Sequence, residues 1–191
     1  QLLSLVLAMA LVLAAYAPIH IPQAMAAALE ITNEATCMAL PDEVSPEWTD
    51  SVCQIDSGTL VVDDIFRINS GVTFEITSNS GVQLNAGATL DNDGAITNDG
   101  TIEAVGAAEI VNAGTLTNTG SFTTGPNTMD NPGIINNSGD FIVSADGTLT
   151  NTGTISNHAT ILNSGTIDNT GTFDNFGTIE NECDVGVVTG E

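Results

Sequence analysis

Six consecutive hexapeptides occupy residues 147 to 182: GTLTNT, GTISNH, ATILNS, GTIDNT, GTFDNF and GTIENE. Position 1 is Gly, replaced once by Ala159, position 2 is always Thr, and position 5 is always Asn. Position 3 holds a large apolar residue in every copy: Leu149, Ile155, Ile161, Ile167, Phe173 and Ile179. Weaker copies precede this run, from GAITND at residue 94 to GIINNS at residue 133. A repeat this regular predicts a repetitive fold rather than a set of independent elements.

The repeat length of six residues favours strands over helices. One apolar residue in six makes no continuous stripe at the helical period of 3.6 residues. An even period suits strands, in which successive side chains alternate between two faces. Positions 1, 3 and 5 then face the interior, and positions 2, 4 and 6 face solvent. Because one apolar residue per repeat is too little to bury alone, the repeats must stack to complete a core.

Glycine spacing predicts the length of one turn of this stack. The intervals Gly87 to Gly106 and Gly106 to Gly125 are 19 residues each, Gly125 to Gly147 is 22, and Gly147 to Gly165 is 18. Three short strands per turn fit these intervals. We therefore predict an all-β, three-sided parallel β-helix with about 18–22 residues per coil and six or seven coils across residues 58–182.

In such a helix the residues of position 3 stack one coil apart, and so do the asparagines of position 5. The predicted asparagine pairs are Asn151 on Asn169, Asn157 on Asn175, and Asn163 on Asn181. Stacked Asn side chains can hydrogen-bond along the axis at the strand spacing of about 4.8 Å. Where the repeat is lost, Pro126 and Pro132 flank the stretch NTMDN, which predicts a loop.

The segments before and after the repeats differ from them in composition. Residues 2–17 carry no charge and lead to two A-x-A cleavage sites, at 24–26 and 26–28. This predicts a secretory signal peptide over residues 1–26, with an N-terminal membrane anchor as the alternative. The usual basic start of a signal peptide is missing, so we expect a fragment that lacks a few N-terminal residues. We expect residues 27–57 to form an N-terminal cap, and residues 183–191 a tail that continues in a longer protein.

Cysteine usage fits an exported protein. Cys37 and Cys53 lie in the expected cap, where a disulfide between them would be worth about 3 kcal/mol in the chain-entropy model. Two free buried thiols are the alternative. Cys183 would then pair either beyond residue 191 or with another molecule.

The charge balance excludes two classes of partner. The chain has 24 Asp and Glu residues and one basic residue, Arg67, for a net charge of −23. Binding of DNA or RNA needs Lys and Arg to displace counterions from phosphates, so we exclude nucleic acid. For the same reason we exclude docking on anionic lipid, and expect no membrane contact beyond the signal peptide. The acidity fits a protein that stays soluble in salty water.

The run GTLTNTGTISN…GTIDNTGTFDN, entered through SGVTFEI and GVQLNAGATLDN, resembles the Gly-Thr-Ile-x-Asn solenoid repeats of secreted prokaryotic surface proteins. Filamentous-haemagglutinin-type adhesins and autotransporter passenger domains have repeats of this style. The resemblance covers about residues 58–182. It implies a right-handed β-helix with an extracellular adhesive or scaffolding role, for which surface glycans or other cell-surface or matrix proteins are the expected partners.

Enzymes built on β-helices need catalytic side chains that are scarce or poorly placed in this sequence. Polysaccharide lyases need cationic groups, and Arg67 is the one basic residue. Hexapeptide acyltransferases use a His, but His20 falls in the expected signal peptide and His158 at a solvent-facing position without an obvious partner. Glycosidases need two convergent carboxylates, and abundant acidic residues on a solvated face do not imply them. We predict no catalytic residues and no required cofactor.

Two binding hypotheses remain. Asp168, Asp174 and Glu180 occupy position 4 in consecutive repeats and are weak candidates for Ca²⁺ ligands, although consecutive repeats fall on different sides of the helix and need not converge. Outward columns of Thr suggest ice binding, but position 4 reads Thr, Ser, Leu, Asp, Asp and Glu, which breaks a regular Thr-x-Thr array. In addition, Asn136 is the acceptor of a glycosylation sequon, Asn136-Asn137-Ser138.

From these observations we predict a secreted or cell-surface structural or adhesive module that presents an acidic, repetitive surface. A carbohydrate-binding or ice-binding solenoid is the alternative.

Overall fold

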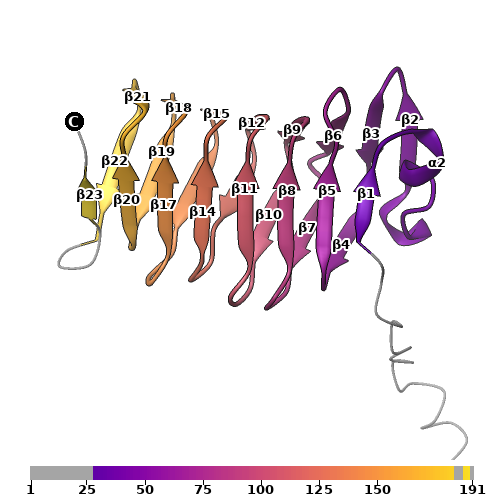
Figure 1. Cartoon of the computed structure of the whole chain (residues 1–191), viewed down its shortest axis with the longest axis horizontal. Coiled ribbons are helices and arrows are strands. Elements are labelled where there is room, and N and C mark those ends of the chain that lie inside the picture. The colour runs from indigo at the N-terminus through magenta and orange to yellow at the C-terminus, as the bar shows by residue number, and fades with distance from the viewer. Residues whose placement is uncertain (1–27, 183–186, 190–191) are drawn as a thin grey trace, which may run out of the picture.

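The chain folds into three parallel sheets that wind around one core. A computed structural model describes residues 28–182 and 187–189. Each coil contributes one strand to each sheet, so neighbours within a sheet are about three strands apart in the chain. Figure 1 shows the coils side by side along the long axis of the molecule, with the N-terminal cap at one end. The predicted three-sided parallel β-helix is confirmed, with about seven turns.

The three sheets are named A, B and C. Sheet A contains β1 (Leu29–Ile31), β5 (Ile65–Ile68), β8 (Thr89–Asn92), β11 (Glu109–Asn112), β14 (Thr128–Asn131), β17 (Thr148–Asn151), β20 (Thr166–Asn169) and β23 (Val187–Thr189). Sheet B contains β2 (Pro46–Thr49), β3 (Val52–Ile55), β6 (Thr73–Ile76), β9 (Ala95–Asn98), β12 (Thr115–Asn118), β15 (Ile134–Asn137), β18 (Thr154–Asn157) and β21 (Thr172–Asn175). Sheet C contains β4 (Gly58–Val62), β7 (Ser80–Leu84), β10 (Thr101–Ala104), β13 (Ser121–Thr123), β16 (Asp140–Val143), β19 (Thr160–Asn163) and β22 (Thr178–Asn181).

Side chains alternate between the core and the solvent along each repeat strand. Leu149, Ile155, Ile161 and Ile167 are at most 1% exposed, because position 3 points inward. The register places Leu149 beside Ile167, Ile155 beside Phe173, and Ile161 beside Ile179. Phe173 and Ile179 are half-buried, since no strand of the described part of the chain lies beyond β21 and β22.

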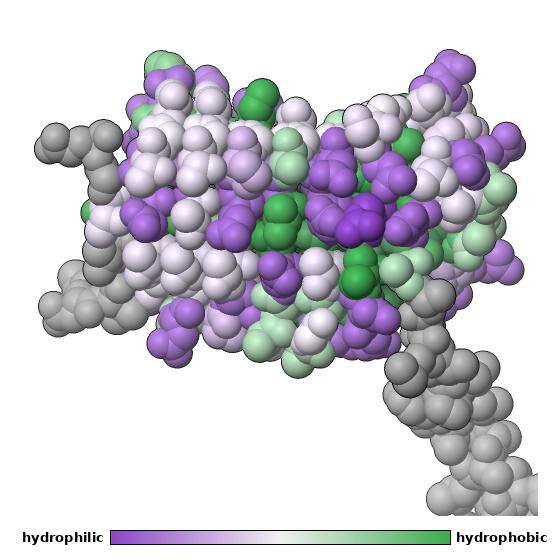
Figure 2. All heavy atoms as spheres, in the orientation of Figure 1, coloured by the Kyte–Doolittle hydropathy of each residue, from purple (hydrophilic) through white to green (hydrophobic). Residues whose placement is uncertain are grey.

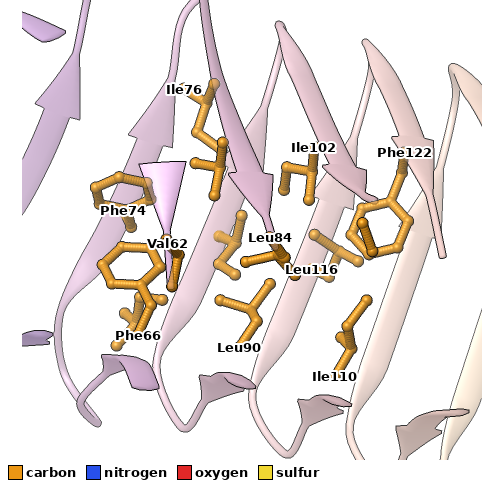
Figure 3. Packing of buried hydrophobic residues seen from close by; sticks show 14 of the residues in the cluster. Val62, Phe66, Phe74, Ile76, Leu84, Leu90, Ile102, Ile110, Leu116 and Phe122 are labelled. Atoms are coloured by element: carbon orange, nitrogen blue, oxygen red, sulfur yellow. The ribbon is translucent and has the colours of Figure 1, made fainter. Parts of the chain in front are cut away.

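Larger side chains fill the core of the earlier coils. Phe66 and Phe74 meet edge to face, with ring centroids 5.0 Å apart, and Phe122 stacks on Phe141 one coil later at 4.9 Å. Figure 3 shows apolar side chains from all three sheets, among them Phe66, Phe74 and Phe122, packed side by side inside the coils. The core is therefore continuous from coil to coil, so each coil completes the burial of its neighbour.

Two asparagine ladders run along the inside of the coils. The first, in sheet A, has Asn92, Asn112, Asn131, Asn151 and Asn169; the second, in sheet B, has Asn98, Asn118, Asn137, Asn157 and Asn175. In both ladders each Nδ2 donates to the Oδ1 of the next coil at 2.6–2.8 Å. In sheet C, Asn163 donates to Asn181 at 3.0 Å. Asn175 and Asn181, on the last coil, are exposed, whereas Asn169 is 6% exposed.

These ladders have a direction. Because every Nδ2 donates toward the C-terminal end, the first Oδ1 in each ladder receives nothing from the coil before it. In that preceding coil, the residues in register with Asn92 and Asn98 are Ile68 and Ile76, which have no side-chain donor. The Oδ1 atoms of Asn92 and Asn98 are accordingly buried without a hydrogen-bond partner.

Glycine at position 1 is needed where successive coils approach most closely. At Gly114 the backbone N–H donates to the Asn92 carbonyl at 2.8 Å, which brings the turn against the coil below. A Cβ added there would collide with the backbone carbonyl of Gly94. The space at this corner therefore excludes a side chain.

Coil length varies more than predicted. Residues in register are 24 apart between β5 and β8, as for Arg67 and Asp91, and 18 apart between β17 and β20, as for Asn151 and Asn169. The predicted upper limit of 22 residues is therefore wrong for an early coil. Its turns, 69–72, 77–79 and 85–88, have three or four residues, whereas the turns 152–153, 158–159 and 164–165 have two.

The loop predicted between Pro126 and Pro132 is also wrong. Residues Thr128–Asn131 form β14, which lies between β11 and β17 in sheet A. Met129 is fully buried in register with Leu149, so a methionine takes the position 3 usually held by Ile or Leu. The turn before β14 is held by Asn127, whose Oδ1 accepts from the Ala108 N–H at 2.6 Å.

The cap is continuous with the solenoid. It comprises β1, the antiparallel pair β2–β3, the short helix α2 (Glu34–Cys37) and the 3₁₀ helix η1 (Asp42–Val44). β1 pairs with β5, and β3 pairs with β6, so stacking begins inside the segment 27–57. A disulfide joins Cys37 to Cys53 and so ties α2 to β3. The expected signal peptide and Cys183 lie outside the described residues, while β23, in the expected tail, pairs with β20.

Candidate functional site

The outer faces of the three sheets are the surfaces that a partner can reach. Positions 3 and 5 of each repeat are inside, so only positions 2 and 4 and the turns present side chains outward. Consecutive repeats go to different sheets: β17, β18 and β19 lie in A, B and C, respectively. The composition of a face must therefore be read along a sheet, every third repeat, rather than along the chain.

The face of sheet A carries more outward carboxylates than the face of either other sheet. They are Glu30, Asp91, Glu109, Asp130 and Asp168, and the residue between Glu30 and Asp91 in register is Arg67. Figure 2 views this face and shows hydrophilic residues mixed with neutral and apolar ones. Like charges in the same row of register are kept apart. For example, Val111 on β11 lies between Asp91 on β8 and Asp130 on β14.

Arg67 lies at the N-terminal end of this acidic face. Its Nη2 and Nε both lie 2.8 Å from Oδ2 of Asp91, and its Nη1 lies 3.3 Å from Oε1 of Glu30. The hydrogen bond and the charge of Asp91, with a smaller effect of Glu30, raise the pKa of Arg67 above its ordinary value. The guanidinium thus links strands β1, β5 and β8 from outside.

The face of sheet B is different, because three consecutive coils of it carry no charge. We call the segments 113–120, 132–139 and 152–159, which contain β12, β15 and β18 with their adjacent turns, the neutral panel. No Asp, Glu, Lys or Arg occurs in these segments. Carboxylates return beyond the panel on both sides, at Asp93 and Asp99 around β9 and at Asp174 on β21.

The prediction that a regular Thr-x-Thr array is broken holds on sheet B, where Ile134, Asn136 and Ser156 interrupt it, but the reason given for it changes. The succession Thr, Ser, Leu, Asp, Asp, Glu at position 4 mixes residues from three faces. On sheet B alone, position 4 reads Thr97, Thr117, Asn136, Ser156 and then Asp174. The acidic residues that interrupted the pattern in the sequence lie mainly on other sheets.

The face of sheet C is mixed. Glu103, Asp140 and Glu180 point outward from β10, β16 and β22. Ile142 and Leu162 are neighbours in register between them and are half-buried. This face shows neither the charge of sheet A nor the uniform polarity of the neutral panel.

A groove of about 610 Å³ lies where the turns from sheet C lead into sheet A. Its walls come from four-residue turns and from the first outward column of sheet A, and include Ala108, Glu109, Pro126, Asn127, Thr128 and Asp146. Asn127 is buried, but its side-chain atoms bond backbone groups of Ala108 and Thr124. The groove therefore offers two carboxylates, Glu109 and Asp146, and two threonines, Thr89 and Thr128, at a shallow, open site.

The weak calcium candidates do not come together. Asp168 lies on β20 in sheet A, Asp174 on β21 in sheet B, and Glu180 on β22 in sheet C. Asp168 instead accepts a hydrogen bond from the Thr189 hydroxyl at 2.9 Å. Within residues 28–182 and 187–189, no group of three His, Cys, Asp or Glu side chains is placed to hold a metal ion.

The remaining candidate residues have the following places. His158 is exposed in the turn after β18 and stacks on Phe176 of the next coil, with ring centroids 4.9 Å apart. Asn136, the sequon acceptor, is exposed in the middle of the neutral panel, whereas the adjacent Asn137 is buried in the ladder.

Comparison with known proteins agrees with this architecture. A family model described as the haemagglutinin repeat matches residues 75–120 and 122–182, which run from β6 to the end of β22. No curated protein and no solved structure matches the chain. Among the helices that the structure describes, none is long and apolar enough to cross a membrane. Because the two matched stretches make up more than half of the sequence, the chain belongs to the haemagglutinin repeat family.

Proposed function

We propose that this chain is a secreted or cell-surface module with an adhesive or structural role, and that it acts by presenting rigid, repetitive faces to surface glycans or to proteins of other surfaces. The observation that carries the proposal is the coincidence of the haemagglutinin repeat match with the stacked coils from β6 to β22. Haemagglutinin repeats form an adhesin-type, non-enzymatic family that is typically extracellular or on the cell surface.

Three further observations support this role. The disulfide in the cap fits an oxidising compartment. The carboxylates of sheet A give the outer surface a repeating charge, which keeps an extracellular protein soluble and directs it toward cationic or neutral partners. The neutral panel of sheet B offers uncharged contact surface along the same rod.

A bead assay tests this proposal. Beads coated with the chain should adhere to cells and to immobilised matrix proteins more strongly than beads coated with Ile161→Asp, which places a charge in the core and disrupts the coils. Antibody labelling of intact producing cells should detect the protein at their surface or in their medium. Equal adhesion of both kinds of bead, on every surface tried, would refute an adhesive role for the folded solenoid.

A further inference from the structure

The neutral panel is an exception on a strongly acidic molecule. With 24 acidic residues in 191, three successive strands of one sheet without an acidic residue are a local departure in composition. Sheet A, over the matching coils, presents Glu109 from β11 and Asp130 from β14. Sheet C presents Asp140 from β16. Over these three coils, sheet B is thus the side on which the absence of charge is unbroken, although the third coil, residues 148–163, carries no charge on any sheet.

The panel presents polar side chains that are free to bond a partner. Thr115 and Thr117 point outward from β12, Asn136 from β15, and Thr154 and Ser156 from β18, because the residues that alternate with them are buried. Among the residues that the structure describes, the side chains of these five make no hydrogen bond. Ile134, 43% exposed, and the threonine methyl groups add apolar surface between them.

The panel is also regular and stiff. Neighbouring strands are about 4.8 Å apart, and outward residues along one strand are about 6.7 Å apart, so the polar groups form a two-dimensional grid. Behind the grid, Asn118 bonds Asn137 and Asn137 bonds Asn157, each at 2.8 Å. Because these three asparagines are fully buried, the strands that carry the grid are fixed from the inside.

We infer that the neutral panel binds the hydroxyl-bearing surface of an ordered, uncharged polysaccharide, an inference that rests on the proposed adhesive function and assigns it to one face. Asp93, Asp99 and Asp174 around the panel repel an anionic partner. A cationic partner would be attracted more strongly to the carboxylates of sheet A than to the neutral panel. Hydroxyl and amide groups pair with sugar hydroxyls as both donors and acceptors. A fixed grid of polar groups matches a partner whose own hydroxyl groups repeat at regular intervals. The partner should also be ordered before it binds, because ordering a flexible chain on binding would add an entropic penalty.

Co-sedimentation with insoluble polysaccharides tests the inference. The whole chain should sediment with microcrystalline cellulose or with chitin particles, and the bound fraction should be unchanged in high salt because no charge is involved. It should not sediment with carboxymethyl cellulose, which carries negative charge. Thr117→Asp should weaken binding at least about tenfold, because contact with the solid would bury an unpaired carboxylate.

Thr148→Asp is the matched control. Thr148 is also an outward threonine with neutral neighbours in register, Thr128 and Thr166, but it lies on sheet A. This variant has the same net charge as Thr117→Asp and should bind like the parent chain, and both variants should melt like the parent.

Several outcomes would overturn the inference. These are failure to bind either neutral polysaccharide, equal weakening by Thr117→Asp and Thr148→Asp, and loss of binding in salt. Thermal hysteresis in freezing solutions without polysaccharide binding would assign the panel to ice instead. If coated beads still adhere to cells after Thr117→Asp while the parent fails to bind polysaccharide, the adhesive function stands and only the assignment of this face fails.

Discussion

Replacing one asparagine within a ladder should cost more stability than replacing the first asparagine of the same ladder. Asn98 and Asn118 are both fully buried in sheet B, one coil apart. The change of either residue to Leu adds similar apolar burial and a similar increase in side-chain volume. The difference between Asn118→Leu and Asn98→Leu therefore reports on the ladder bonds rather than on hydrophobicity.

The structure gives the size of this difference. Asn118→Leu removes the ladder bonds to Asn98 and Asn137, at 2.7 and 2.8 Å, and leaves Oδ1 of Asn137 buried without a donor. Asn98→Leu removes only the first of these bonds. It leaves Oδ1 of Asn118 without a donor, but it also removes an Oδ1 that already lacked one. One additional buried, unsatisfied carbonyl costs about 1–3 kcal/mol.

Thermal melting followed by circular dichroism measures this difference. For a chain of this size, 1 kcal/mol corresponds to about 2–4 °C in Tm, so Asn118→Leu should melt between about 2 and 12 °C below Asn98→Leu. Urea unfolding should rank the two variants in the same order. Equal melting temperatures, or an Asn118→Leu variant more stable than the parent, would show that the ladder bonds add nothing beyond the water contacts they replace.

Three further changes test other parts of the fold. Ile155→Asp should destabilise the chain by more than about 4 kcal/mol because it buries a charge, whereas Thr154→Asp should stay within about 0.5 kcal/mol; equal losses of Tm would mean that the two faces of the strand are inverted. Reduction of Cys37–Cys53 should lower the free energy of unfolding by about 3 kcal/mol, and an unchanged melting curve in reductant would contradict a stabilising role for the cap disulfide. Arg67→Gln should lower the Tm at low ionic strength, because Glu30 and Asp91 lose their counter-charge, and the loss should shrink in high salt; a loss that is independent of salt would point to packing instead.

The hexapeptides were sufficient to predict the fold and the orientation of side chains. The period of six determines which residues face inward, and the interval of 18 residues places Leu149 beside Ile167. Both features follow from local alternation and from the need to bury one apolar residue per repeat, so they can be predicted from the chain alone.

What could not be predicted depended on turns and on the grouping of repeats. β14 was missed because Met129 replaces the usual Ile or Leu and two prolines flank the strand, although the register still places it on Leu149. The neutral panel was missed because its residues are about 20 apart in the chain, with repeats from two other faces between them. A repeat pattern shows that a residue is outside, but only the number of repeats per coil shows which outside residues are neighbours.

The three-strand coil has a consequence for how the length of this protein can change. Loss or gain of one hexapeptide would keep every apolar residue inside, yet it would rotate all following repeats by one sheet. Thr154 and Ser156, for example, would move to a different side of the rod from Thr115 and Thr117. Length changes of about one full coil would instead preserve each side. The fold therefore tolerates insertions or deletions of six residues. The set of outward residues on each sheet is preserved only when the length changes by one full coil, about 18 to 20 residues.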